Sequence, residues 1–170
     1  MQKRLLLITG LAVLTTLQGA DPKSRSGNDA AAAFARLKTL AGEWEANTPG
    51  GKARLSYELT GGGTALVERE NAESEPGMMT VYHLDGGRVI LTHYCMAGNQ
   101  PRMQTAGMDP QTGEIQFHFL DVTNLSSPRA AHMHNVMLRI IDNNHVDSEW
   151  QLYENGAPKM TEKAHYTRVR

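Results

Sequence analysis

The chain has 170 residues, which is enough for one domain with a sizeable core. Its 17 Lys and Arg nearly balance its 18 Asp and Glu, and no run of basic residues is present, which argues against a nucleic-acid partner. Cys95 is the single cysteine, so an internal disulfide is excluded, and a domain of this size folds without one.

Residues 1–20 have the pattern of a signal peptide. Lys3 and Arg4 form a charged start, and residues 5–17 form an apolar segment that is short for a membrane span. Small residues favour cleavage after Ala20, and an uncleaved N-terminal anchor is the alternative. We therefore expect an exported protein, periplasmic or secreted, with no stable membrane span after the leader is removed.

One helix is expected in the mature chain. Residues 21–28 are polar and rich in turn formers, which predicts a flexible tether. A helix capped near Asp29 follows, since Phe34 and Leu37 fall on one face within an alanine-rich segment. Gly42 is expected to end it.

Beyond the helix, turn-forming and strand-forming segments alternate to the end of the chain. The segments of strand length are Glu43–Asn47, Ala53–Leu59, Ala65–Glu70, Met79–Leu84, Val89–Cys95, Met103–Met108, Glu114–Asp121, Ala131–Ile141, Val146–Tyr153 and Lys159–Val169. Short hairpin connections predict an all-β antiparallel meander. Closure into a roughly ten-stranded barrel over residues 29–170, with the helix plugging one end, would remove the exposed edges of such a sheet.

The segment 34–44 resembles the opening of the calycin, or lipocalin-like, barrels. In them a short helix plugs one end and a Gly-x-Trp motif, here Gly42-Glu43-Trp44, begins the first strand. The resemblance implies that the Trp packs beneath the helix and that a basic residue of the last strand, Arg168 or Arg170, lies across its ring.

Within the calycins the chain is most similar to the nitrobindin-like, haem-binding-like barrels and to uncharacterised exported bacterial relatives. His165 lies near the C-terminus, where nitrobindins place their haem-ligating His, but its spacing to the terminal Arg differs. Glu45-Ala46-Asn47 stands where nitrobindins continue with a Gly-rich segment. Haem therefore stays open as a cofactor.

A polar hairpin is the first candidate ligand site. It carries His93, Tyr94, Asn99, Gln100 and Arg102. His93 is expected inside the barrel, because it shares the face of apolar neighbours two and four residues earlier. Polar hairpins at a barrel rim commonly control access to a cavity. Alternatively, Asn99 and Gln100 only build the turn, and Arg102 pairs with a surface acid.

His132 and His134 form the second candidate. Two residues apart on a strand, they lie on one face about 6.6 Å apart and can converge on a divalent metal. Alternation places them with Val136 and Leu138, so they and His93 are expected to face one interior space, with Arg102 near its rim. The alternative is that they lie at a frayed strand start and bind nothing.

These features predict a protein that binds a small hydrophobic or amphipathic molecule in or at the mouth of the barrel. One alternative is an enzyme in which His93, His132 and His134 perform acid–base chemistry, with or without a metal. Another is a packed barrel with a structural role. Nucleophilic hydrolysis has no support, since no Gly-x-Ser-x-Gly motif is present.

Overall fold

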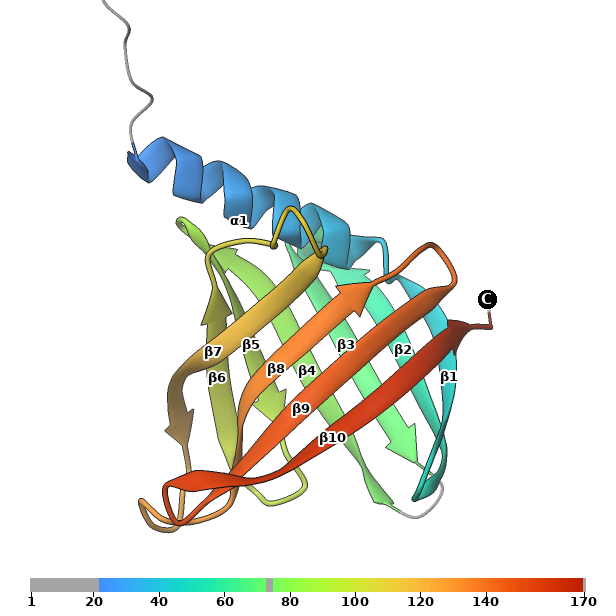
Figure 1. The fold of residues 1–170 in the computed structure, drawn as a ribbon, viewed down its shortest axis with the longest axis vertical. Coiled ribbons are helices and arrows are strands. Elements are labelled where there is room, and N and C mark those ends of the chain that lie inside the picture. The colour runs from blue at the N-terminus through green and yellow to red at the C-terminus, as the bar shows by residue number, and fades with distance from the viewer. Residues whose placement is uncertain (1–21, 73–74, 170) are drawn as a thin grey trace, which may run out of the picture.

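The computed structural model describes residues 22–72 and 75–169 (Figure 1). The expected signal peptide, residues 1–20, lies outside this part, as does Arg170. The elements in chain order are α1 (Pro22–Lys38), β1 (Gly42–Thr48), β2 (Gly51–Thr60), the 3₁₀ turn η1 (Gly61–Gly63), β3 (Ala65–Ala72), β4 (Glu75–Asp85), β5 (Arg88–Tyr94), β6 (Gln100–Thr105), β7 (Glu114–Thr123), β8 (His132–Ile140), β9 (His145–Glu154) and β10 (Ala157–Arg168).

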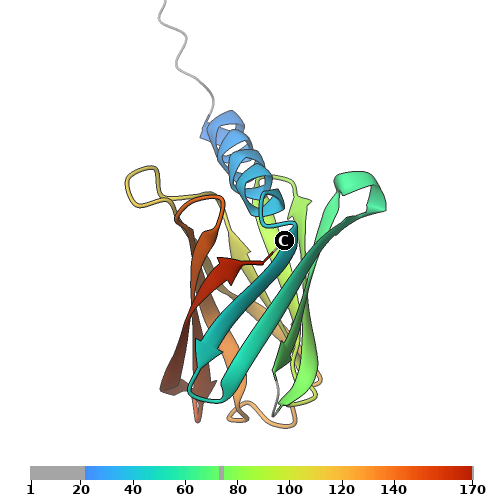
Figure 2. The same cartoon turned by 90° about the vertical axis from the view of Figure 1, so that its right-hand side faces the viewer.

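The ten strands of the described residues form one closed antiparallel barrel (Figures 1 and 2). Each strand pairs with its neighbours in sequence, and β1 pairs with β10 to close the sheet. The predicted meander and barrel are therefore confirmed. Alternation along β7 shows why the strands form, because Ile115 and Phe117 are buried while Gln116 and His118 are exposed.

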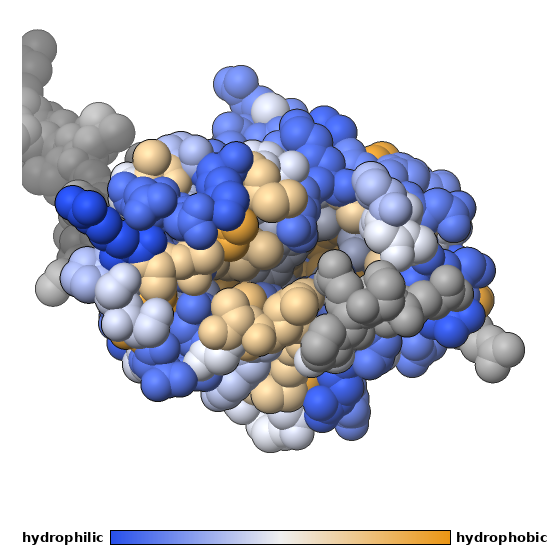
Figure 3. Space-filling view, turned by 90° about the horizontal axis from the view of Figure 1, so that it is seen from below, coloured by the Kyte–Doolittle hydropathy of each residue, from blue (hydrophilic) through white to orange (hydrophobic). Residues whose placement is uncertain are grey.

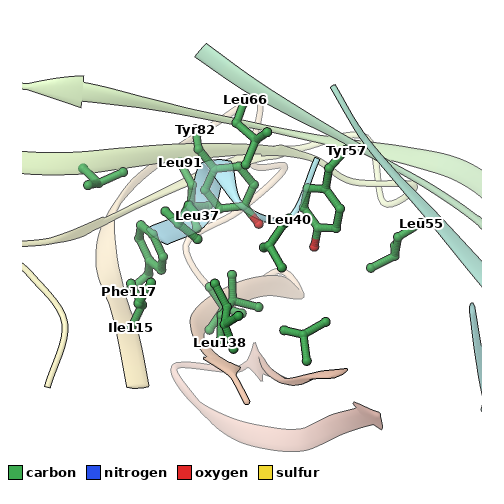
Figure 4. Close-up of a cluster of buried hydrophobic side chains, with 14 of the residues drawn as sticks. Leu37, Leu40, Leu55, Tyr57, Leu66, Tyr82, Leu91, Ile115, Phe117 and Leu138 are labelled. Atoms are coloured by element: carbon green, nitrogen blue, oxygen red, sulfur yellow. The ribbon is translucent and has the colours of Figure 1, made fainter. Parts of the chain in front are cut away.

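The helix α1 lies across one end of the barrel (Figures 1 and 2). Phe34, Leu37 and Leu40 are buried, and Leu37 and Leu40 meet side chains from several strands (Figure 4). Gly42 has φ of 130°, a conformation that favours glycine where the chain turns into β1. Within the described residues, no helix combines the length and apolarity that crossing a bilayer requires.

The helix begins earlier than the sequence indicated. Residues 22–28 were expected to form a flexible tether, and the structure instead continues α1 back to Pro22. A proline suits the first helical turn, where its missing N–H has no partner to lose. The alanine-rich segment that follows then extends the helix at little cost.

Trp44 and Arg168 meet as the resemblance implied. The indole of Trp44 is 1% exposed, and its Nε1 donates to the carbonyl oxygen of Leu40 at 2.7 Å. The guanidinium of Arg168 lies 4.1 Å from the ring centroid and donates to the carbonyls of Thr39, Ala41 and Asn143. Arg168 therefore ties the last strand to the end of α1, where backbone carbonyls lack helical partners.

Replacement of Trp44 by alanine should lower the free energy of unfolding by about 3–5 kcal/mol, because a large buried aromatic side chain leaves a cavity. Denaturant titration followed by circular dichroism measures this change. Tyr94→Ala is the control, since its ring is 46% exposed and its loss should change stability by no more than about 0.5 kcal/mol. Equal melting of wild type and Trp44→Ala would contradict the packing role.

Candidate functional site

A cavity opens beside the seam between β1 and β10, the strand pair that closes the barrel. In the described residues β1 and β10 share two register pairs, Trp44 with Arg168 and Glu45 with Thr167. Farther from α1, the β1–β2 turn and the residues 160–163 of β10 border a cavity of about 320 Å³. Viewed from the end opposite α1, apolar surface gathers around a recess between the strand ends (Figure 3).

Most of the cavity wall is apolar. Ala53 and Leu55 contribute from β2, Met133 and Leu138 from β8, and Trp150 from β9. Aliphatic and aromatic walls with a few polar groups are typical of sites for small organic molecules. The polar groups of this wall are therefore the ones that can orient a ligand.

Four inward side chains form a polar row across β2, β3, β4 and β5. Tyr57 lies opposite Glu68, Glu68 opposite Thr80, and Thr80 opposite His93 in the strand register. Residues directly opposite one another in antiparallel strands point to the same face, so the register alone brings the four together. Tyr57, Glu68 and His93 line the cavity.

Glu68 is the carboxylate of the polar row and is buried. Tyr82 donates to it at 2.7 Å, and the hydroxyl-bearing residues Tyr57 and Thr80 are its register partners on β2 and β4. Burial raises the pKa of Glu68, whereas the three hydroxyl donors act to lower it. Burial, followed by the charge of Glu68, raises the pKa of both tyrosines well above the ordinary value, so they remain donors.

His93 ends the polar row with one nitrogen free. Its Nδ1 lies 2.9 Å from Thr80 Oγ1, and its ring centroid lies 4.8 Å from that of Trp150. The side chain is 3% exposed, and no group of the described residues hydrogen-bonds to its buried Nε2. Burial lowers the pKa of His93 to about 4, so the imidazole is neutral near pH 7.

The other residues of the predicted hairpin site do not line this cavity. Tyr94 is exposed, and Arg102 pairs with Asp121 on the surface through two hydrogen bonds. Asn99 is buried and donates to the carbonyl of Ala131 at 3.0 Å. Gln100 accepts from Thr123 and donates to the carbonyl of Gly98. A ligand role for these four residues stays a prediction that the cavity does not support.

His132 and His134 form a separate cluster. His132 Nε2 lies 3.1 Å from His134 Nδ1, and the His134 ring stacks on Phe119 and Tyr153 at 4.2 and 3.9 Å. Burial and the neighbouring His132 lower the pKa of His134. Among the described residues, no group of three His, Cys, Asp or Glu is arranged to hold a metal.

His132 and His134, which were expected to share an interior space with His93, do not line the cavity that His93 lines, and a bulge explains why. The β8–β9 register shifts between Met133 and Asn135. A bulge inserts one residue and exchanges the faces of those beyond it. Met133, between the two histidines, therefore lines the cavity in their place.

His165 does not line the cavity either. Its ring is exposed, with Nδ1 2.6 Å from Asp147 Oδ1, and it stacks at 5.6 Å on His145. The haem ligand that the resemblance implied near the C-terminus therefore lies on the outer surface in this chain.

Sequence reasoning missed Tyr57, Glu68 and Thr80. One signal was present, because Glu68 alternates in step with Leu66, which is fully buried. Val67 offers an equally apolar position on the other face, so alternation alone does not choose between them. The register in which β2, β3, β4 and β5 pair determines that Glu68, and not Val67, faces the interior.

No protein-family model matches the chain, and a search of curated proteins also finds no match.

The low pKa of His93 predicts a specific pH dependence of stability. The folded-state pKa lies below the ordinary value of 6.5, so protonation favours the unfolded chain as the pH falls from 6.5 toward 4. His93 should therefore remove about 3 kcal/mol of stability across this window. Glu68, whose pKa is raised, contributes with the opposite sign.

Comparison with His93→Phe separates the two contributions, since Glu68 is common to both proteins. Unfolding free energies measured by denaturant titration at several pH values should fall more steeply toward acid for wild type than for His93→Phe. His118→Phe changes an exposed histidine and is the control. Parallel curves for wild type and His93→Phe would contradict the burial of a neutral imidazole.

Proposed function

We propose that the protein binds a small, predominantly apolar molecule inside the barrel. The observation that carries this proposal is the unpartnered Nε2 of His93, buried in the wall of a cavity of about 320 Å³. An unsatisfied buried polar atom costs about 1–3 kcal/mol, and a bound molecule that hydrogen-bonds to it offsets that cost.

The cavity favours binding over the packed-barrel alternative. Its volume of about 320 Å³ falls within the range of roughly 300–1,000 Å³ typical of small-molecule sites. A solidly packed barrel of this size has its interior filled by side chains. A recess is visible on the surface at the end opposite α1, where a ligand would enter under this proposal (Figure 3).

The geometry favours binding over catalysis by a histidine cluster. The enzyme hypothesis needed His93, His132 and His134 together, whereas His93 lines the cavity and the other two contact Phe119 and Tyr153. One neutral imidazole in an apolar wall is suited to orienting a bound molecule.

Two contacts support a relationship to the calycin barrels, which we include in the proposal. The first is the burial of Trp44 of the Gly-x-Trp motif beneath α1, and the second is the position of Arg168 across its ring. Both are features that the resemblance implies. Ligand binding within the barrel agrees with that relationship.

Filling the cavity should weaken binding. The side chain of Ala53 lines the cavity, so Ala53→Phe should weaken binding of the neutral fluorophore N-phenylnaphthylamine at least tenfold, a change of about 1.4 kcal/mol. Fluorescence titration measures the affinity. Glu58→Phe, at an exposed position of the same strand, is the matched control and should bind like wild type. Equal affinity of all three proteins would place the fluorophore outside the barrel.

We further propose that the mature protein is exported to the periplasm or the medium. The charged and apolar segments at the start of the sequence support this proposal. N-terminal sequencing of the protein from its native cells should begin near Asp21. An intact leader on protein from the cytoplasmic fraction would contradict export.

A further inference from the structure

We infer that the molecule bound in the cavity is uncharged, contains a ring, and donates a hydrogen bond from an O–H or N–H group to Nε2 of His93. This inference rests on the proposed function and specifies its ligand class. Phenols and neutral azoles belong to that class, and carboxylates and ethers do not.

The direction of each hydrogen bond in the polar row determines what His93 offers. Ionised Glu68 only accepts hydrogen bonds, and Tyr82 donates to it at 2.7 Å. Thr80 lies opposite Glu68 in the strand register, and in the inferred arrangement it directs its single hydroxyl proton to that carboxylate. The Thr80 oxygen then accepts from His93 Nδ1–H at 2.9 Å. A neutral imidazole with its proton on Nδ1 presents a lone pair at Nε2. A ligand that pairs with this nitrogen therefore carries a hydrogen-bond donor.

The charges of the wall exclude an anionic ligand. Glu68 and Glu70 line the cavity, while Lys163 contributes from β10 near the opening. An anion placed beside His93 would lie near a buried carboxylate and receive no proton from the neutral imidazole. Glu68 already accepts a hydrogen bond from Tyr82, and the hydroxyls of Tyr57 and Thr80 act to stabilise its charged form, so the inferred ligand needs no positive charge either.

The walls also favour a ring-shaped body. Trp150 lies beside His93, with ring centroids 4.8 Å apart, and Tyr57 and Tyr166 line the same cavity. Aromatic side chains pack well against the faces and edges of other rings. A ligand with one or two rings fits a volume of about 320 Å³.

Isothermal titration calorimetry of the full chain with four matched naphthalenes tests this inference. We expect naphthol to bind about tenfold more tightly than methoxynaphthalene, which has the same body and no donor. Naphthoate should bind more weakly than either. Naphthylmethylamine, a cation at neutral pH, should also bind more weakly than naphthol.

Three variants locate the contact. His93→Phe should reduce naphthol affinity to that of methoxynaphthalene and leave methoxynaphthalene affinity unchanged. Thr80→Val should lose the preference for naphthol, because Nδ1–H loses its acceptor and no longer fixes the ring proton. Thr80→Ser retains the hydroxyl and should retain the preference, which distinguishes a positioning role from a loss of packing.

A measurement on the unmodified protein keeps the inference testable if a variant fails to fold. Nitrogen-15 NMR of the His93 ring should report a neutral imidazole protonated at Nδ1 near pH 7. Protonation at Nε2 would overturn the inference whatever the variants do.

The possible failures are distinguishable. Equal binding of naphthol and methoxynaphthalene, or tighter binding of naphthoate or naphthylmethylamine, would overturn the donor assignment and leave the proposed binding function standing. If none of the four compounds binds, and N-phenylnaphthylamine also fails to bind, the proposed function is wrong and this inference falls with it.

Discussion

The contacts of one side chain, Arg168, reinforce the closure of the barrel, because the pairing of β1 with β10 is short. In the described residues β1 and β10 meet at two register positions, which supplies few backbone hydrogen bonds for a seam. Arg168 adds a guanidinium against the Trp44 ring and hydrogen bonds to three carbonyls, two at the end of α1 and one in the β8–β9 loop. A single side chain thus holds the helix, the first strand and the last strand together. The β1–β10 pairs and the Arg168 contacts lie at one end of this seam, and the cavity is bordered by the parts of both strands that lie farther from α1.

The polar row adds a constraint that stability alone does not require. A buried carboxylate with three hydroxyl partners is at best weakly stabilising, and apolar residues of similar size often fill such a space more favourably. His93 also leaves one buried nitrogen unpartnered. Groups that lower stability and lie together in a cavity are candidates for function, because selection for folding alone would replace them. The barrel interior therefore has a cavity with polar groups at one end and a packed apolar core at the end that α1 covers.

The sequence predicted the features that depend on local pattern. Strand alternation and turn residues located all ten strands of the described chain, and apolar neighbours placed His93 inside. The resemblance placed Arg168 against Trp44. The features that the sequence did not predict depend on the pairing between strands. Glu68 becomes a site residue because the register sets it between Tyr57 and Thr80, and His134 leaves the interior because a bulge shifts the β8–β9 register. A one-residue shift moves every later side chain to the other face, and no residue type in His132–Asn135 marks it.

In the binding mode that we propose, Glu68 determines which hydrogen-bonding group the ligand carries, although the ligand does not need to contact it. An ionised carboxylate accepts hydrogen bonds and cannot donate them, so a Thr80 hydroxyl directed to Glu68 would leave the His93 proton on Nδ1. An amide at the same place could donate to Thr80, which would then donate to Nδ1 and move the imidazole proton to Nε2. The cavity would offer a donor where it now offers an acceptor, with its shape and apolar walls unchanged. In the proposed binding mode, shape selection by the walls and polar selection by His93 are therefore separable, and the second depends on Glu68, which lies two strands away from His93.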